Sequence, residues 1–182
     1  MIKVIAFDMV GVLVGEKYIE LTNEESKLER MFGPNINDED YLLKGLEVIN
    51  NKNELINVTL DVVNKLYYIK DKDIFKKIKY NFKDIKIIIA TNHVSYIRSF
   101  IENNMDSDLI DDIVISAEIN KIKPNNDFYL YILDKYNIEA NELLFLDDNI
   151  DNINGASSLG INTIKVNKNE DVFNLIFEWF KK

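Results

Sequence analysis

The sequence of 182 residues has no cysteine, one histidine, two prolines and six glycines. Without cysteine the chain can form neither disulfides nor thiolate metal sites, which suits a reducing cytoplasm. No internal repeat and no low-complexity linker interrupts the sequence. We therefore expect one compact domain, or one domain with a small insertion, in the cytoplasm.

Basic residues and long apolar runs are also scarce. The chain has 22 Lys and Arg against 31 Asp and Glu, a formal net charge of -9. No basic stripe is available to neutralise a duplex, so we expect no nucleic-acid partner. Small phosphorylated ligands remain compatible with this charge, because a divalent cation held by carboxylates inverts the local field. No apolar run approaches the roughly 20 residues of a membrane helix, and the first strand begins at once, so we expect no membrane span and no signal peptide.

The first apolar stretch organises what is present. Val4 to Phe7 is a continuous β-branched and aromatic run, typical of a strand covered on both faces of a parallel sheet. The predicted strand ends at Asp8, and Gly11 follows. Ligands of open α/β sheets bind beyond the carboxyl ends of the strands, so Asp8 is a candidate site residue.

Residues 16–81 have a different pattern. Charged and apolar residues alternate at helical spacing with no strand pattern, which predicts three or four helices. Turn-prone compositions predict breaks at Gly33-Pro34-Asn35, around Asn50 to Asn53, and near Lys70 to Asp73.

The remainder of the chain alternates between strand and helix. We predict strands at 85–90, 113–116, 143–146 and 161–166, and helices at 96–103, 126–136 and 172–180, with a further helix around Ile153 and Ala156. This alternation favours right-handed crossovers. The predicted fold class is therefore α/β, with a Rossmann-like parallel sheet of five strands.

Polar groups follow three of these strands. Asp8 ends the first, Thr91 and Asn92 end the second, and Asp147 and Asp148 end a later one. A further basic candidate, in the loop before the helix at 126–136, is Lys123. We expect these side chains to meet at one edge of the sheet.

In this order the groups resemble the four motifs of the haloacid dehalogenase superfamily: a nucleophilic aspartate, a Thr or Ser, a lysine and paired acids. The first motif reads DMVGVL, where the family usually has Asp-x-Asp-Gly-Thr/Val-Leu. The stretches ISAEINKIKPNNDFYLYIL and LFLDDNIDNINGASSLGINTI are similar to the helical-cap subgroup, which includes sugar-phosphate phosphatases and the amino-terminal phosphatase domain of some epoxide hydrolases.

The resemblance covers essentially the whole core and implies a domain arrangement. Residues 1–15 and 82–182 would form the Rossmann-like core, and residues 16–81 a small helical cap inserted after the first strand. Such a cap covers the site and selects substrates. The alternative is a single helical layer without a gating role.

The resemblance also implies a nucleophile and a metal site. Asp8 would attack phosphorus and form an aspartyl-phosphate. Mg²⁺ would be held by Asp8, the backbone carbonyl of Val10, and Asp147 or Asp148, and would offset the repulsion between the carboxylate and the phosphate.

Phosphate binding would fall to the second and third motifs. Lys123 would orient the nucleophile and the phosphate, and the Thr91 hydroxyl would bind a phosphoryl oxygen with Asn92 beside it. Lys121 is a poorer candidate than Lys123 because it lacks the following proline. His93 could be a general base, but no carboxylate is near it in sequence, which favours a role at the entry to the next helix.

Val10 stands where the family has its second aspartate, the residue that protonates the leaving group. Such acid-base assistance contributes roughly 10² to 10⁴ in rate. A substrate with a good leaving group would need less of it, and a cap carboxylate or Glu16 could substitute. We predict a Mg²⁺-dependent phosphomonoesterase acting on a small phosphorylated metabolite, of unspecified oligomeric state.

Two rival hypotheses remain. Because valine cannot transfer protons, the protein could be a catalytically impaired member that binds phosphate ligands or a protein partner. Alternatively it could be a dehalogenase, or a phosphonate hydrolase with a Schiff-base lysine in the cap, for which Lys27, Lys44 and Lys52 are candidates. Taken singly, Asp8 and the Asp147-Asp148 pair also suit turn or helix-capping roles, and Lys123 suits a solvated surface position.

Overall fold

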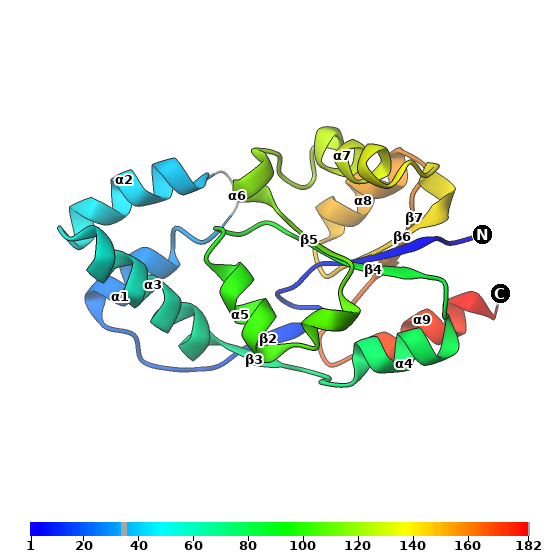
Figure 1. Cartoon of the computed structure of the whole chain (residues 1–182), viewed down its shortest axis with the longest axis horizontal. Helices are drawn as coiled ribbons and strands as arrows, with labels where there is room; N and C mark the ends of the chain where they lie inside the picture. Colours follow the sequence, from blue (N-terminus) through cyan, green and yellow to red (C-terminus); the bar gives the residue numbers. More distant parts are fainter. Residues whose placement is uncertain (34–35, 182) are drawn as a thin grey trace.

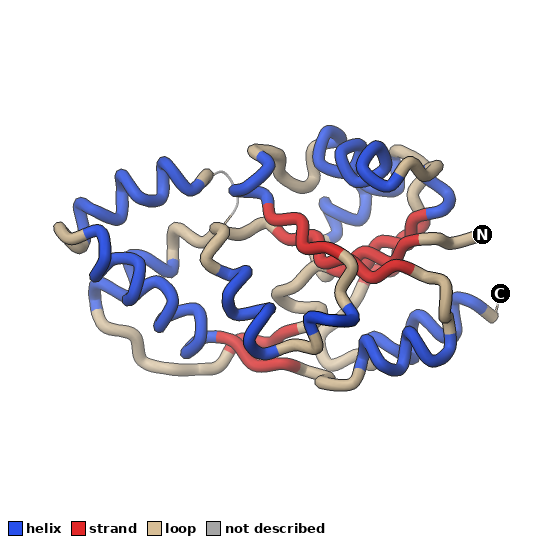
Figure 2. The backbone as a smooth tube through the Cα atoms, viewed as in Figure 1, coloured by secondary structure: helices blue, strands red, loops and turns tan. Residues whose placement is uncertain are grey.

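The computed structural model describes residues 1–33 and 36–181, so Pro34 and Asn35 of the first predicted break lie outside the described residues. A five-stranded parallel sheet with strand order β5-β4-β1-β6-β7 forms the centre (Figures 1 and 2). Its strands are β1 (Val4–Phe7), β4 (Lys86–Thr91), β5 (Asp112–Ile115), β6 (Leu143–Asp147) and β7 (Asn162–Lys165). The predicted α/β class with a five-stranded parallel sheet is confirmed.

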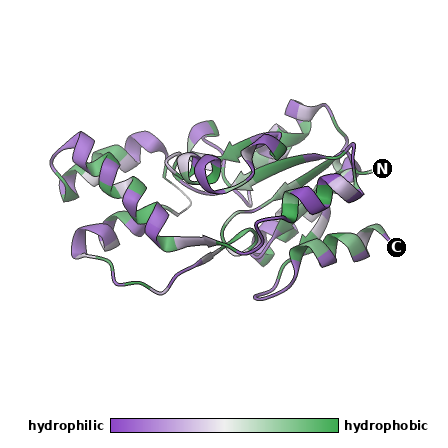
Figure 3. Cartoon of the chain, turned by 60° about the horizontal axis from the view of Figure 1, so that its bottom comes forward, coloured by the Kyte–Doolittle hydropathy of each residue, from purple (hydrophilic) through white to green (hydrophobic). Residues whose placement is uncertain are grey.

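Helices cover both faces of the sheet (Figure 3), so β1 and the inner part of its two neighbours, β4 and β6, are apolar and buried. In β1, Val4 and Ala6 pack with the helices of one face, and Ile5 and Phe7 pack with those of the other. The first face carries α7 (Asn126–Tyr136) and α8 (Ile150–Ser158), and the second carries α4 (Ile74–Asn81), α5 (Ile97–Asn104) and α9 (Val172–Phe180). None of the helices in the described part of the chain has both the length and the apolar character needed to cross a bilayer.

Three helices inserted after β1 lie beyond the carboxyl ends of the strands, at the left of Figure 1. They are α1 (Asn23–Glu29), α2 (Asp38–Val48) and α3 (Lys52–Leu66). Each begins at a side-chain cap: Thr22 and Glu25 form a capping box on α1, Asn37 caps α2, and Asn51 caps α3. With α4, these helices fulfil the prediction of three or four helices within residues 16–81.

A two-stranded antiparallel ribbon was not expected. It consists of β2 (Val14–Glu16) and β3 (Tyr67–Ile69), with Glu16 opposite Tyr67. The prediction that residues 16–81 contain no strand is therefore wrong at Glu16 and at β3. Strands of three residues are too short to show a two-residue alternation, so the sequence carries no periodic signal for them. The ribbon brings both connections of the insertion together beside the sheet.

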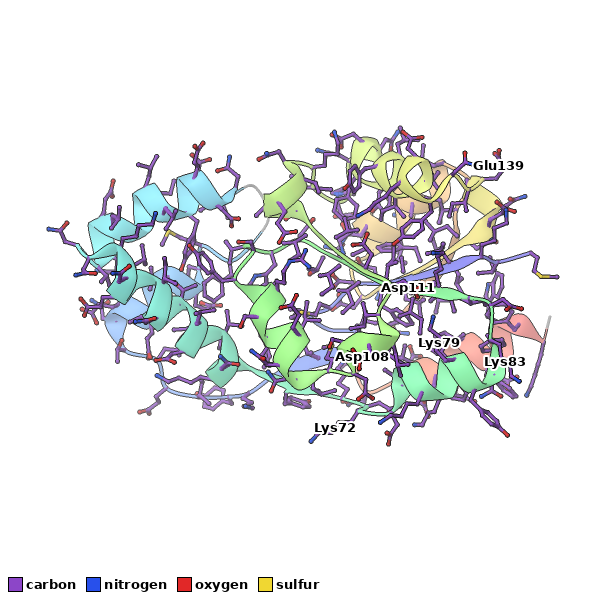
Figure 4. The ribbon with its side chains drawn as sticks, viewed as in Figure 1. Lys72, Lys79, Lys83, Asp108, Asp111 and Glu139 are labelled. Atoms are coloured by element: carbon purple, nitrogen blue, oxygen red, sulfur yellow. The ribbon has the colours of Figure 1, made fainter. Side chains whose placement is uncertain are left out.

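Helix α4 lies with the core. It packs against α9, and the Lys79 Nζ atom lies 2.9 Å from Asp111 Oδ2, just before β5 (Figure 4). The same Asp111 oxygen accepts a hydrogen bond from the backbone N–H of Ile87 in β4, at 2.8 Å. We propose that the cap comprises residues 17–66 and that the core resumes at the ribbon, where the sequence had suggested residue 82.

His93 lies at the junction of cap and core, before α5 begins at Ile97. The residue is 3% exposed, and its ring packs against Phe32 of the cap, with ring centroids 5.2 Å apart. Nδ1 donates to the Val94 carbonyl at 3.1 Å, so Nε2 accepts from the Tyr67 hydroxyl, also at 3.1 Å. Burial lowers the pKa of His93 to about 4. The neutral ring therefore serves the packing of the cap on the core.

Candidate active site

Asp8 lies at the end of the central strand β1. Its backbone N–H donates to the Leu146 carbonyl at 2.8 Å, which continues the pairing of β1 with β6. After Asp8 the chain turns sharply, because the backbone N–H groups of Leu13 and Val14 both donate to the Met9 carbonyl. The Asp8 carboxyl is thereby fixed at the middle of the sheet edge, with 8% of the residue exposed.

Gly11 permits this turn to approach the second acidic strand end. Its φ of +88° lies in the left-handed region, and a Cβ at this position would be 2.1 Å from Asp148 Oδ2. A side chain would both strain the backbone and displace the carboxylate. Gly11 therefore sets the distance between the Asp8 loop and Asp148.

Asp8, Asp147 and Asp148 form a cluster of three carboxylates. Each offers one oxygen, and these oxygens all lie within 4.8 Å of one another. Asp147 is fully buried: Oδ1 accepts from the Asn149 N–H at 2.8 Å, and Oδ2 accepts from Asn152 Nδ2 at 3.0 Å. Asp148 is more exposed, and its pKa is raised by partial desolvation and by the neighbouring Asp147.

Lys123 joins two of these carboxylates. Its Nζ atom lies 2.7 Å from Asp8 Oδ1 and 2.7 Å from Asp147 Oδ2, and the residue is only 2% exposed. Burial acts to lower the pKa of Lys123, but Asp8 and Asp147 outweigh it and raise the pKa above its usual value. Lys123 is therefore a charged ammonium inside the protein.

The charges of the cluster are not balanced by Lys123 alone. Burial raises the pKa of Asp8 to about 6, against the lowering effect of Lys123, and Asp147 raises it further. One ammonium faces three carboxylates, and oxygen donors of this kind suit a hard divalent cation such as Mg²⁺. The donor set therefore fits the metal that the sequence predicts.

Thr91 and Asn92 end β4 beside this cluster. Thr91 is 1% exposed and borders the same cavity as Asp8. Asn92 Nδ2 donates to the Lys123 carbonyl at 2.8 Å, and the Lys123 N–H donates to Asn92 Oδ1 at 3.0 Å. The carboxamide of Asn92 is therefore committed to the loop that carries Lys123.

The predicted site residues meet at one cavity of about 470 Å³ at the carboxyl edge of the sheet. We call this the catalytic cavity. Among its lining residues are all seven of those predicted: Asp8, Val10, Thr91, Asn92, Lys123, Asp147 and Asp148. A further carboxylate of the lining is Asp151, at the start of α8.

A second cavity of about 400 Å³, the cap cavity, adjoins the first. Ile122 and Asn125 line both. The cap contributes Ile36, Asn37 and Asp40 to it, and the core contributes the remaining residues: Ser116, Asn120, Lys121, Ile122, Asn125 and Asp127.

Four residues considered in the sequence lie elsewhere. Glu16 is exposed on the ribbon, and Lys27, Lys44 and Lys52 are exposed on the cap helices. None of the four is among the described residues that line either cavity. A Schiff-base lysine therefore gains no support from the cap.

Sequence reasoning missed several residues of the site. Asn152 holds Asp147, and its signal was an asparagine on the inward face of a helix otherwise packed through Ile153 and Ala156. The close approach of Gly11 to Asp148 had a weaker signal, a single glycine after a strand. Nothing in the sequence indicated that Asn125 lies between two cavities, because this position depends on where the cap lies.

Comparison with known proteins is consistent with this geometry. The sequence profile of the family described as haloacid dehalogenase-like hydrolase matches residues 7–166. Drimenol cyclase drtB of Aspergillus calidoustus is 33% identical over 67 residues, which are 37% of this chain and 13% of that protein. The chain thus spans only a small part of the length of this curated relative.

Solved structures share the fold over nearly the whole chain. A predicted haloacid dehalogenase-like hydrolase from Porphyromonas gingivalis superposes with a TM-score of 0.76 at 18% identity, covering 100% of this chain and 99% of that one. A family enzyme from Bacteroides thetaiotaomicron, solved with magnesium and inorganic phosphate, gives 0.70 at 16% identity, covering 94% and 97%. A predicted phosphoglycolate phosphatase from Haemophilus somnus gives 0.66 at 13% identity, covering 96% and 91%.

Proposed function

The chain belongs to the haloacid dehalogenase-like hydrolases, a family of enzymes, and on this premise we propose that it is a Mg²⁺-dependent phosphomonoesterase acting on a small phosphorylated metabolite. The observation that carries the proposal is the buried ammonium of Lys123, 2.7 Å from both Asp8 and Asp147 in a cavity that Thr91 also lines. A buried cation between carboxylates at a cavity floor suits the binding and transfer of a phosphoryl group.

Asp8 is the proposed nucleophile. Lys123 holds its Oδ1 atom, which orients the carboxylate for attack on phosphorus by the other oxygen. The new bond joins Asp8 to phosphorus, the ester P–O bond breaks, and the leaving oxygen takes up a proton from water, because Val10 supplies none. Water then hydrolyses the aspartyl-phosphate, which releases phosphate and restores Asp8.

Mg²⁺, when bound, would offset the repulsion between the Asp8 carboxylate and the phosphate dianion and polarise the phosphoryl group. Asp8 and the Asp147-Asp148 pair would hold it, with the backbone carbonyl of Val10. The magnesium and phosphate found together in the Bacteroides thetaiotaomicron structure support this assignment.

The remaining residues of the catalytic cavity would bind and orient the phosphate. The Thr91 hydroxyl and the Lys123 ammonium would donate to phosphoryl oxygens. Asn92 would act mainly through Lys123, because its carboxamide binds the backbone of that residue. Positioning of this kind supplies much of the rate in phosphoryl transfer.

Val10 favours a second candidate function. An apolar side chain lines the catalytic cavity where the family's acid would stand, so the protein would bind phosphate esters more readily than it turns them over. Asp40 is the cap carboxylate in the adjoining cavity, and it is a better substitute acid than Glu16, which lies on the ribbon. Substrates with good leaving groups would need this assistance least.

A screen of phosphorylated metabolites with and without Mg²⁺ tests the proposal. We expect phosphate release that requires Mg²⁺ and is lost in Asp8→Asn, an isosteric change. Asp134→Asn, an exposed position on α7 outside both cavities, is the matched control and should behave as the parent. Binding of phosphate with Mg²⁺ but without turnover of any ester would support the binding protein instead.

A further inference from the structure

The segment of residues 92–95, between β4 and α5, contacts both the lysine loop of the core and the cap. At its start the Asn92 carboxamide binds the Lys123 backbone through two hydrogen bonds. At its end the Ser95 backbone N–H donates to Asp38 Oδ1, in α2 of the cap, at 3.0 Å. One short segment therefore connects a carboxylate of the cap with the loop that carries the buried ammonium.

Asp38 acts as a capping residue for α5, although it lies 57 positions away from Ser95 in the sequence. The first N–H groups of a helix have no partner within the helix, and they favour a nearby negative charge. Tyr96, the residue that precedes α5, makes no capping hydrogen bond with its side chain. Ser95 lies in the turn that begins this helix, because its carbonyl accepts from the Arg98 N–H at 2.9 Å. The cap therefore supplies an acceptor that the core itself does not place there.

Aromatic packing beside this hydrogen bond keeps α2 against the segment. Asp38 and Tyr41 are three positions apart and so lie on one face of α2. The fully buried Tyr41 ring packs against the Tyr96 ring, with centroids 5.6 Å apart. The Asp38 carboxylate is half-buried at this contact. Its position is therefore well defined, as positioning of a backbone segment requires.

The core holds the middle of the segment at His93. The His93 N–H donates to Ser116 Oγ at 3.0 Å, whereas the His93 carbonyl accepts from the Ala117 N–H only at a longer 3.4 Å. A rotation of the segment about His93 would move its two ends in opposite directions. The hydrogen bond at Ser95 therefore also restrains Asn92, at the other end.

From these contacts we propose that Asp38 is a positioning residue for phosphoryl transfer. By accepting the hydrogen bond from Ser95 it fixes the segment, and through Asn92 it places the Lys123 ammonium. This inference rests on the proposed phosphatase function and deepens it. Asp38 is not among the described residues that line either cavity, so its effect reaches the substrate only through other residues. The effect on the rate is therefore the same for every ester.

Asp38→Ala removes the acceptor and tests the proposal. We expect kcat to fall about tenfold, by the same factor for glycerol 3-phosphate and for propyl phosphate, and inorganic phosphate to bind the Mg²⁺-loaded protein severalfold more weakly. The assays use a temperature at which circular dichroism shows each variant to be folded, so that lost stability does not lower kcat. A kcat equal to that of the parent, or a fall for only one of the two esters, would overturn the proposal.

Two further variants distinguish the hydrogen bond from the charge. Asp38→Asn is isosteric and keeps an oxygen that accepts from Ser95, so its kcat should stay within about threefold of the parent. Glu39→Ala is the matched control, because it removes a carboxylate from the same first turn of α2 at an exposed position. Glu39→Ala should retain the kcat of the parent. A fall in either variant as large as that in Asp38→Ala would overturn the proposal.

Two measurements without turnover separate this inference from the proposed function. They are the affinity of the Mg²⁺-loaded protein for inorganic phosphate and the hydrogen exchange of the Ser95 amide, which should be faster in Asp38→Ala. Weaker phosphate binding and faster exchange in Asp38→Ala, with no ester hydrolysed by the parent, would sustain the inference while the phosphatase proposal fails. Turnover that requires Asp8, with kcat and phosphate affinity unchanged in Asp38→Ala, would reject the inference alone.

Discussion

The carboxamide of Asn92 binds both sides of the Lys123 backbone, donating to its carbonyl at 2.8 Å and accepting from its N–H at 3.0 Å. The two residues are 31 positions apart, so this contact ties a loop before α7 to the end of β4. The position of the buried ammonium between Asp8 and Asp147 depends on that loop.

Asn92→Ala removes both hydrogen bonds. We expect a fall of about 1–3 kcal/mol in the free energy of unfolding, measured in urea, and a fall in kcat of roughly tenfold or more as Lys123 shifts. Asn64→Ala is the control, since Asn64 makes one exposed local hydrogen bond within α3. If Asn92→Ala retains the parent's stability and kcat, Asn92 does not position Lys123.

Gly11→Ala places a Cβ against Asp148 and forces a side chain into the left-handed region, at a cost of about 1–2 kcal/mol. We expect lower thermal stability and weaker Mg²⁺ binding, measured by calorimetry. Gly33→Ala is matched in chemistry, and a Cβ there would meet no atom within 4 Å. Equal Mg²⁺ affinity in the parent and Gly11→Ala would mean that Asp148 does not bind the metal.

The buried His93 predicts a loss of stability in acid. Its pKa is about 4 in the folded protein against 6.5 for the free side chain, so the unfolded chain takes up the proton first as the pH falls. Above pH 6.5 the lowered pKa of His93 leaves the free energy of unfolding unchanged. Below about pH 4 it lowers that free energy by about 3 kcal/mol.

The raised pKa of Asp8 has the opposite effect over part of this range, because the folded protein takes up that proton before the unfolded chain does. Comparing the parent with His93→Gln therefore isolates the contribution of His93. Urea unfolding between pH 7 and pH 4 should show a shallower decline in His93→Gln than in the parent. Parallel curves for the two proteins would mean that His93 does not titrate as its burial requires.

Val10→Asp returns a carboxylate to the catalytic cavity. If the missing acid limits turnover, kcat should rise most for primary alkyl phosphates, up to the ~10² to 10⁴ of general acid-base catalysis. Aryl phosphates, whose leaving groups are better, should gain much less. The parent could instead hydrolyse alkyl phosphates efficiently, and Val10→Asp could bring no gain that depends on the leaving group. That result would mean that another residue supplies the proton to the leaving group.

The sheet and the central part of the site were predictable because each depends on local signals. A buried strand such as Val4–Phe7 is apolar throughout, and polar residues after such strands must meet at one edge of a parallel sheet. Asp8, Thr91 and Asp147 lie at the cavity for this reason.

The remainder depends on tertiary contacts that leave no periodic pattern. The ribbon of β2 and β3 is stabilised by pairing across the whole cap insertion, and each strand is too short for an alternation to be visible. The packing of α4 on α9 follows from the fold of the core, and residue spacing does not reveal it. The same holds for Asn92, whose neighbours in sequence indicate a ligand contact although its carboxamide binds the Lys123 backbone.

The proposed function depends on transfer of the phosphoryl group to Asp8. Its most direct test is rapid acid quenching of the Mg²⁺-loaded protein during turnover of an aryl phosphate, followed by mass spectrometry of the peptide that contains Asp8. We predict a peptide heavier by one phosphoryl group, with the modification at Asp8 and absent from Asp8→Asn. Continued hydrolysis by Asp8→Asn, or turnover in the parent with the phosphoryl group on another residue, would contradict the account.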